Sequence, residues 1–454
     1  MAIASRNPAT EELLKEFAEL TKEEINQKLE FADQSFKSWR DSTLEERDQL
    51  LKNLAEILIE RKEDIAKLAS LEIGQPIKSV YSEIEKCATL ARYYEGRIEE
   101  FLKDEIIATE AQMSYVTHEP LGTILGIAPW NFPFWMAFRF IIPTICAGNT
   151  VVLKHASNVP QCALAIQNIM IEAGFPEGVF QTLLVSSSQV ESIINDPRIK
   201  GVSFSGSESA GAIVASQAGK EIKKSLLELG GSDAFIIFED ADLPSTVKIL
   251  VENRLRNAGQ ACNSPKRVFV HKNILSEFTT LAKEILANVK LGDPLDLTTE
   301  IGPLASLKGL KDVERQISES VAKGAKIITG GKRIEKKGFF YEPTIIINVN
   351  PGMPVFDEEV FGPVIAVIEF ENNLEAIKLA NDSRYGLGAS IWTKDIEEAK
   401  KYINKLETAN VFVNQPVRSD PRLPYGGTKK SGYGRELSNF GIKEFINIKT
   451  VVIK

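Results

Sequence analysis

Residues 123–157 read TILGIAPWNFPFWMAFRFIIPTICAGNTVVLKHAS, a stretch in which two kinds of pattern alternate. The short apolar run Thr123–Ile127 predicts a strand, and the longer run Trp135–Cys146, closed by Gly148, predicts a helix. The β-branched run Thr150–Leu153 predicts a second strand. A strand, a helix and another strand in succession are typical of a parallel sheet covered by helices.

The same stretch is also long and apolar enough to suggest a membrane span, because Arg139 is the only charged residue between Pro120 and Lys154. Prolines 129, 133 and 143 interrupt it, and a helix in lipid would lose backbone hydrogen bonds at each of them. We therefore expect a buried strand, a tight turn and a buried helix, and no membrane association.

The alternation continues on the C-terminal side of this stretch. We expect a helix over Gln161–Ala173 and strands at Phe180–Val185 and Gly201–Phe204. The first hundred residues are expected to be helical, since apolar residues recur at helical spacing over Leu44–Leu71 before Gly74. This pattern indicates an α/β fold whose first part has the Rossmann-type architecture of dinucleotide-binding domains.

A second α/β pattern begins near Asp233. Its predicted strands are Ala234–Phe238, Arg267–Val270, Ile365–Phe370 and Ala389–Trp392. The chain has 454 residues, more than one hydrophobic core usually serves, so two or more domains are expected. The tail Ile446–Ile453 alternates as a strand without an obvious partner. Such strands often pair across subunits, and we expect a homodimer or homotetramer.

Composition excludes several classes of function. With 62 acidic and 54 basic residues the net charge is −8, which argues against a nucleic-acid partner. The histidines 118, 155 and 271 are far apart, so no metal site is expected. Four scattered cysteines indicate a reducing compartment, and no targeting signal is visible from Met1 to Asn7, so we expect a cytoplasmic protein.

Cys262 is the candidate nucleophile. It lies in GQACNS (259–264), on a turn between a helix that ends near Asn257 and the strand that begins at Arg267. A thiol on such a turn is accessible to a ligand, but it must lose its proton before it can attack a carbonyl group. Local context leaves open the other interpretation, a small core residue. That interpretation is preferred for Cys87, Cys146 and Cys162, which lie in apolar helical surroundings.

Glu228 favours the catalytic interpretation. It stands at the end of a predicted strand in SLLELGG (225–231), among leucines and before two glycines. A carboxylate in apolar surroundings is costly to ionise, so its pKa should rise toward neutrality, as a general base requires. A buried ion pair is the alternative.

Asn131 lies in PWNFP (129–133), where a proline two residues away on each side stiffens the loop. A rigidly held amide is a suitable oxyanion-hole donor, although a turn-forming Asn has the same pattern.

Two further segments suggest a cofactor. Residues 206–211, GSESAG, follow a strand and open a helix, where backbone N–H groups can bind phosphate, although this is neither GxGxxG nor a P-loop. Lys154 and Ser157 lie near the end of the second predicted strand, the place where a dinucleotide-binding domain contacts the adenosine ribose. A cation and a hydroxyl there, in place of an acid, favour NADP over NAD.

Together these motifs resemble the aldehyde dehydrogenase superfamily over nearly the whole chain. They are PWNFP (129–133), LKHAS (153–157), FSGSESAG (204–211), LELGGSD (227–233), GQACNSPKR (259–267), EEVFGPV (358–364) and GGTKKSGYGREL (426–437). The closest likeness is to short bacterial-type succinate-semialdehyde dehydrogenases, on the basis of KHAS and of VRSD (417–420).

The resemblance implies an NAD(P)-dependent oxidation of succinic semialdehyde, or a similar semialdehyde, to the acid. It implies that Cys262 forms a thiohemiacetal and then a thioester, that Asn131 and the backbone N–H of Cys262 form the oxyanion hole, and that Glu228 activates water. The cofactor residues that it implies are Trp130, Asn131, Lys154, Ser157, Gly206, Ser207, Leu229, Glu359 and Phe361.

The resemblance also implies three parts. A cofactor-binding domain is expected over 1–106 and 122–231, a catalytic domain over 232–425, and oligomerisation segments over 107–121 and 426–454, which form a small β-sheet. In two places the sequence departs from many relatives. Glu208 replaces a threonine in the phosphate loop, and Ser264 replaces a second cysteine, so we expect no disulfide at the nucleophile.

Arg139 suggests the substrate. It lies two turns after Asn131 in an apolar helix, where a buried cation without an anion would be costly. We hypothesise that Arg139, helped by Ser419, binds the distal carboxylate of the substrate. The alternative is an ion pair with a structural carboxylate.

Three other functions stay open. They are a broad aliphatic or aromatic aldehyde dehydrogenase, a CoA-acylating relative, and a cysteine hydrolase. Glu228 argues against the second, because a water-activating base would compete with thiol transfer. The absence of a histidine in a suitable motif argues against the third.

Overall fold

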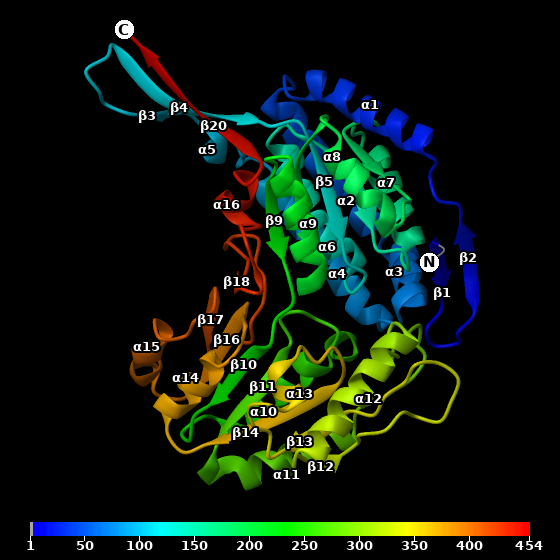
Figure 1. Ribbon diagram of the computed structural model, residues 1–454, viewed down its shortest axis with the longest axis vertical. Helices are drawn as coiled ribbons and strands as arrows, with labels where there is room; N and C mark the ends of the chain where they lie inside the picture. The colour runs from blue at the N-terminus through cyan, green and yellow to red at the C-terminus, as the bar shows by residue number, and fades with distance from the viewer. Residues whose placement is uncertain (1–2) are drawn as a thin grey trace.

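The computed structural model describes residues 3–454 and shows two large sheets with surrounding helices and a small projecting sheet (Figure 1). Met1 and Ala2 lie outside the described residues. They begin the predicted cofactor-binding domain and the N-terminal stretch in which no targeting signal was seen.

The first large sheet has the strand order β19-β9-β8-β5-β6-β7. Its strands are β5 (Thr123–Ala128), β6 (Thr150–His155), β7 (Phe180–Thr182), β8 (Ile199–Ser205), β9 (Lys224–Glu228) and β19 (Gly432–Tyr433). The helices between them are α6 (Pro133–Cys146), α7 (Pro160–Glu172), α8 (Val190–Asn195) and α9 (Glu208–Lys220). All pairs except β19 with β9 are parallel, which confirms the predicted α/β fold. The strand order reverses between β5 and β8, where such sheets bind ligands beyond the carboxyl ends of their strands.

The strand predicted over Phe180–Val185 is shorter than expected. It ends at Thr182, and the chain then turns, with the N–H of Val185 bonded to the carbonyl of Leu183. Leu183 and Val185 are both buried, so they are apolar because they pack in the core and not because they belong to a strand.

The N-terminal region is helical only from Lys22 onward. Its helices are α1 (Lys22–Trp39), α2 (Leu44–Glu60), α3 (Lys62–Ile73), α4 (Ile77–Tyr94) and α5 (Ile98–Leu102), so the helix expected over 44–71 is two helices with a break at Arg61. Before them stands a hairpin that the sequence analysis missed, formed by β1 (Ile3–Arg6) and β2 (Leu13–Phe17). Contacts distant in sequence hold it, since the N–H of Ala4 donates to the carbonyl of Ser157.

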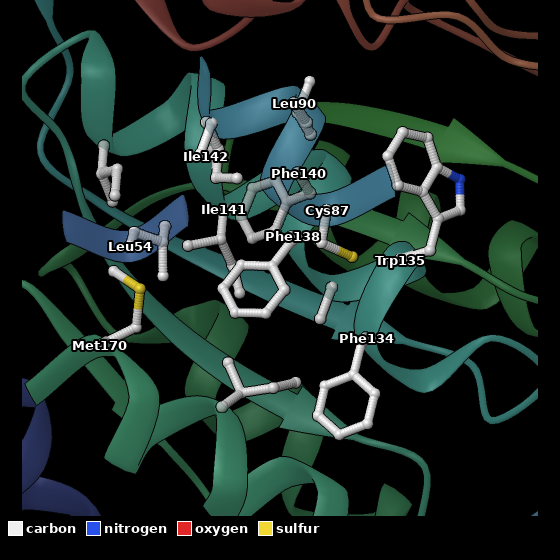
Figure 2. Packing of buried hydrophobic residues seen from close by; sticks show 14 of the residues in the cluster. Leu54, Cys87, Leu90, Phe134, Trp135, Phe138, Phe140, Ile141, Ile142 and Met170 are labelled. Atoms are coloured by element: carbon white, nitrogen blue, oxygen red, sulfur yellow. The ribbon is translucent and has the colours of Figure 1, made fainter. Parts of the chain in front are cut away.

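Helix α6 forms the centre of the first core. All of its 14 residues are buried, as expected of a helix that is apolar on every face. Figure 2 shows its Phe138, Ile141 and Ile142 among residues of neighbouring helices such as Leu54 and Leu90. Within residues 3–454 no helix is both long and apolar enough to cross a membrane.

The second large sheet has the order β12-β13-β14-β11-β10-β16-β17. Its strands are β10 (Asp233–Ile237), β11 (Pro265–His271), β12 (Lys326–Thr329), β13 (Thr344–Ile347), β14 (Val364–Phe370), β16 (Gly388–Trp392) and β17 (Asn410–Val413). Its helices are α10 (Leu243–Leu255), α11 (Leu275–Ala287), α12 (Leu307–Ala322), α13 (Pro354–Asp357), α14 (Asn373–Asn381) and α15 (Ile396–Ile403). Every predicted strand of this part is present, with ends shifted by one or two residues at most.

The small sheet projects as an arm from one end of the molecule (Figure 1) and has the order β20-β4-β3. Its strands are β3 (Glu105–Ile106), β4 (Met113–Pro120) and β20 (Ile446–Ile453). The strand predicted at 446–453 is present. Its partner, which was not obvious from the tail alone, is β4, with which it pairs antiparallel along its whole length.

The remaining elements are β15 (Tyr385–Gly386), β18 (Thr428–Lys429) and α16 (Ser438–Ile442), and in Figure 1 α16 and β18 lie between the arm and the second large sheet. Short 3-10 turns occur at Ser187–Gln189, Arg256–Gly259 and Lys272–Ile274. The segment 426–454 is therefore divided in the structure. Its first part joins the first large sheet through β19, and only β20 enters the arm.

Candidate active site

Cys262 lies where two cavities meet. The larger, about 340 Å³, extends toward the carboxyl ends of β5, β8 and β9, and the smaller, about 250 Å³, extends toward α4 and the loop around Ser419. Met136, Arg139 and Cys262 line both. A reactive group at this junction contacts a ligand in either cavity.

The turn before Cys262 has an unusual backbone. Asn257, Ala258 and Gly259 have φ angles of 50°, 54° and 76°, all in the left-handed region. For the two non-glycine residues this conformation is costly and persists only where surrounding contacts enforce it. At Gly259 no side chain fits, because a Cβ would lie 2.1 Å from the carbonyl oxygen of Gly362. The strained backbone of Asn257 and Ala258 thus lies a few residues before the Cys262 thiol.

Two buried cations hold this turn. Arg254 donates from Nη1 to the hydroxyl of Ser264 at 2.8 Å, so the residue that replaces a second cysteine takes part in the support of the turn. Lys266 Nζ donates to the carbonyl oxygens of Ala261 and Cys262 at 2.7 and 2.6 Å. Because both cations are fully buried, their N–H groups need these oxygen acceptors, and the backbone around the thiol is fixed.

Cys262 is the only one of the four cysteines with an exposed part; Cys87, Cys146 and Cys162 are buried and unreactive by position. Burial raises the pKa of the Cys262 thiol to about 11, although Arg139 and Lys266 act in the opposite direction. The resting form is therefore the neutral thiol, and a base must remove its proton when it attacks.

Asn131 is tied to the same turn. Its Nδ2 donates to the carbonyl oxygen of Gln260 at 3.0 Å, and its own carbonyl oxygen accepts from Asn257 Nδ2 at 2.6 Å. An amide nitrogen carries two N–H groups, so the second remains to donate to a ligand beside Cys262. Asn131 is 5% exposed and lines the larger cavity, which is the position that an oxyanion donor requires.

Glu228 ends β9 and lines the larger cavity. Burial raises its pKa to about 8; Arg139 lowers it, and the neighbouring Glu436 raises it. The predicted rise is thus present for the predicted reason, and the group is poised to exchange a proton near neutral pH.

The structure gives Arg139 two carboxylate partners within the chain. Its Nη2 lies 3.4 Å from Glu228 Oε2, and its Nε contacts Glu436 Oε2, with all three side chains buried. Burial alone would lower the pKa of Arg139, but the two carboxylates outweigh it and raise the pKa. Arg139 therefore has the structural carboxylate partners that the alternative required, and its charge is already compensated before any substrate enters.

Glu359 lies in the larger cavity, held by the backbone of the loop after β9. Its Oε1 accepts from the N–H of Gly231 at 3.1 Å and lies 3.3 Å from Lys266 Nζ. A Cβ at Gly230 would lie 2.2 Å from Glu359 Oε2, so this approach requires a glycine. Lys266 thus links Glu359 to the backbone that carries Cys262.

Aromatic rings flank the same cavity. Trp130 and Phe361 lie edge to face with ring centres 6.0 Å apart, and both line the cavity. Gly206, Ser207 and Leu229 line it as well, with Ser207 as the N-cap of α9. Seven of the nine residues expected at a cofactor are thereby brought together: Trp130, Asn131, Gly206, Ser207, Leu229, Glu359 and Phe361.

Glu208, the departure in the phosphate loop, does not leave its charge unbalanced. Its carboxylate lies 3.2 Å from Arg384 Nε and 4.0 Å from Lys430 Nζ. Arg384 precedes β15, and Lys430 lies between β18 and β19.

Lys154 and Ser157 do not line either cavity. Lys154 lies on β6 opposite Ile127 of β5. Ile127 stands three residues before Trp130, which lines the larger cavity. Burial lowers the pKa of Lys154. Ser157 follows two residues after the end of β6 and is half-buried. Both therefore lie at the edge of the sheet from which the larger cavity opens, on the neighbouring strand.

The smaller cavity contains Ser419 and several cations that sequence reasoning missed. Lys86, Arg256 and Arg418 line it, against a single carboxylate, Glu83. Arg256 Nη2 donates to Asn263 Oδ1 at 3.1 Å, but its Nε is buried without a hydrogen-bond partner among the described residues. A buried donor of this kind is costly unless a ligand accepts from it.

Lys266 and Glu436 were missed as well, although both lie inside the quoted motifs. The signal for Lys266 was a charged residue inside a buried strand, and the signal for Glu436 was a carboxylate at the end of the glycine-rich motif 426–437. Residues 3–454 contain no group of three or more metal-ligating side chains arranged around one point.

A family model described as "Aldehyde dehydrogenase family" matches residues 1–451. The chain belongs to the aldehyde dehydrogenase family. This membership confirms the resemblance to the aldehyde dehydrogenase superfamily seen in the sequence.

Named relatives of this aldehyde dehydrogenase cover its full length. It is 46% identical over 453 residues, 100% of both chains, to a probable succinate-semialdehyde dehydrogenase [NADP(+)] of Synechocystis, and 43% identical, again over 100% of both chains, to succinate-semialdehyde dehydrogenase [NADP(+)] 1 of Mycobacterium tuberculosis. Among solved structures it is similar to the succinic semialdehyde dehydrogenase of Streptococcus pyogenes in complex with NADP+, with a TM-score of 0.97, 38% identity and 99% of each chain covered.

Proposed function

We propose that this protein oxidises succinic semialdehyde to the acid with NADP as the preferred cofactor. The observation that carries the proposal is the position of Cys262 between a cavity lined by the expected cofactor residues and a cavity lined by cations. The names of the relatives, succinate-semialdehyde dehydrogenases of the NADP(+) type, support both the aldehyde and the cofactor.

We assign the binding of the distal carboxylate to Arg256 and Ser419. Within the part of the chain that the structure describes, the buried Nε of Arg256 has no hydrogen-bond partner and Arg256 forms no ion pair with a carboxylate, whereas Arg139 is already paired with two carboxylates. An anion placed against Arg256 gains a charge-assisted hydrogen bond and relieves the cost of the buried donor. A neutral aldehyde gains neither.

The larger cavity fits a nicotinamide dinucleotide. Gly206 and Ser207 present the start of α9 to it, and Glu359 is held so that its carboxylate can accept from a ribose hydroxyl. Lys154 and Ser157, on the neighbouring strand, are assigned to the adenosine ribose and its 2′-phosphate, where a cation offsets the added negative charge. When bound, the dinucleotide supplies the acceptor for the hydride of the aldehyde carbon.

The residues of this chain divide the chemistry among them. As the sulfur of Cys262 adds to the aldehyde carbon, its proton passes to water in the cavity, and Asn131 with the backbone N–H of Cys262 binds the oxygen that becomes negative. After oxidation to the thioester, Glu228 takes a proton from water, which attacks the acyl carbon and releases the acid and the thiol. Arg139 and Glu436 set the proton affinity of Glu228 through their charges.

We further propose that the division into a cofactor-binding part, a catalytic part and an arm serves an oligomer. The arm exposes large apolar residues such as Ile106, Ile448 and Val452, which are 72%, 65% and 60% exposed. Side chains of this kind on a projecting sheet favour burial against a second copy, in a dimer or tetramer.

The test is absorbance at 340 nm with succinic semialdehyde or butanal and with NADP or NAD. We expect the highest kcat/KM with succinic semialdehyde and NADP. Equal values for both aldehydes would favour a broad aldehyde dehydrogenase, and reduction only in the presence of CoA would favour the acylating alternative. Cys262→Ser must abolish reduction of the cofactor, and unchanged activity in that variant would overturn the proposal.

A further inference from the structure

Lys86 is a half-buried cation without an ion-pair partner in the smaller cavity. It projects from α4, the helix that also carries Glu83 one turn earlier. No carboxylate among the described residues lies within ion-pair distance of its ammonium group. Glu83 does not neutralise it, because Glu83 Oε1 accepts from the backbone N–H groups of Phe134 and Trp135 at 2.8 and 2.9 Å at the start of α6.

The contacts of Lys86 leave one donor unused. Its Nζ donates to Ser419 Oγ at 2.7 Å and lies 4.0 Å from the centre of the Trp135 ring. An ammonium group has three N–H bonds, and these two contacts occupy two directions. The third N–H of Lys86 is therefore free to donate to a ligand in the smaller cavity, which Cys262 also lines.

We propose that Lys86 is a specificity-determining residue that binds the distal carboxylate of the aldehyde together with Ser419, in addition to Arg256. This inference rests on the proposed function, because it concerns the same substrate in the same cavity. Ser419 accepts its hydrogen bond from Lys86, so its own O–H is directed away from the lysine and is available to donate to the carboxylate.

The surroundings of Lys86 explain why a substrate anion matters there. Burial and the charges of Arg256 and Arg139 lower the pKa of Lys86 to about 7. The charged and titratable groups that face it are Glu83 and Cys87 on its own helix, Arg139 on α6, Arg256 before Cys262, and Arg418 and Asp420 beside Ser419. Cations predominate in this set, so an incoming carboxylate favours the charged form of Lys86 and binding takes up a proton above neutral pH.

The decisive variant is Lys86→Met, which keeps the apolar stem against Trp135 and removes the charge. We expect KM for succinic semialdehyde to rise about tenfold or more, as the loss of a charged hydrogen bond implies, and kcat/KM for butanal to change less than about twofold. Lys86→Arg should retain most of the affinity for the semialdehyde. A matched control is Lys62→Met, since Lys62 also lies over an aromatic ring, that of Tyr81, and lines neither cavity.

Binding of succinate provides a readout that a structural role would not move. Calorimetric titration at pH 8 in buffers of different ionisation enthalpy should show less proton uptake with Lys86→Met than with the unaltered protein, because Glu228, with a pKa of about 8, is present in both. Equal loss of activity on both aldehydes, or unchanged proton uptake in the variant, would overturn the inference. If the unaltered protein itself does not prefer succinic semialdehyde over butanal, the proposed function fails. That outcome is measured without any variant, so it can be told apart from a failure of the inference about Lys86.

Discussion

The guanidinium group of Arg139 lies 3.4 Å from the carboxylate of Glu228, and both side chains are buried. The nearest charge to the candidate base is thus a cation shared with a second carboxylate, Glu436. Such an arrangement tunes a proton affinity, because a change in any one of the three charges alters the pKa of the other two groups.

Arg139→Met should impair both aldehydes to the same extent. Removal of the cation raises the pKa of Glu228 further above about 8, so less of the base is ionised at neutral pH and kcat falls by about tenfold for each unit of the shift. The pH at which kcat is half-maximal should move upward, and pH–rate profiles measure it. Folding stability should also drop by about 3–5 kcal/mol in urea titrations, since a buried pair is broken. A loss confined to succinic semialdehyde would return the role of anion binder to Arg139.

Glu228→Gln should separate the two halves of the reaction. The amide cannot accept a proton from water, so the thioester should accumulate after oxidation. Rapid mixing at 340 nm should then show a burst of about one equivalent of reduced cofactor per active site, followed by a slow phase. In the unaltered protein the slow step should accelerate as pH rises through about 8, because the deprotonated carboxylate is the active form. A variant that turns over normally would exclude Glu228 as the base.

Asn131→Ala tests the oxyanion donor. We expect kcat/KM to fall about a hundredfold or more, which corresponds to about 3 kcal/mol of transition-state stabilisation. Because Asn131 also donates to the carbonyl of Gln260, alkylation of Cys262 by iodoacetamide should be measured in parallel. Normal alkylation with a hundredfold loss assigns the effect to the oxygen of the substrate, whereas a matching loss of alkylation would assign it to the turn.

Ser157→Glu tests the cofactor assignment. A carboxylate at the end of β6 should repel a 2′-phosphate and accept from a free 2′-hydroxyl, so KM for NADP should rise at least about tenfold while KM for NAD stays equal or falls. Steady-state kinetics with each cofactor at saturating aldehyde measures the ratio. Ser188→Glu, a surface serine outside both cavities, is the control for added charge. Parallel changes with both cofactors would contradict the assignment.

Much of the fold could be predicted because its signals are local. The strands at 234–238 and 446–453 and the helix at 135–146 show their period or their unbroken apolar character within a few residues. The hairpin at residues 3–17 was missed because its stability comes from contacts such as that of Ala4 with Ser157, which no local pattern reports.

The sequence by itself determined the chemical inventory: a thiol on a turn, a carboxylate among leucines, a stiffened amide and the order of the motifs, since these depend on residue type and on short spacing. Only the tertiary structure decided which charges meet. Arg139 and Glu436 are distant in the chain yet in contact, while Lys86 and Arg256 reach the cavity of Cys262 and form no ion pair with a carboxylate of residues 3–454. The energy of a charge depends on what surrounds it within a few ångströms, and those neighbours come from helices and strands that the fold alone brings together.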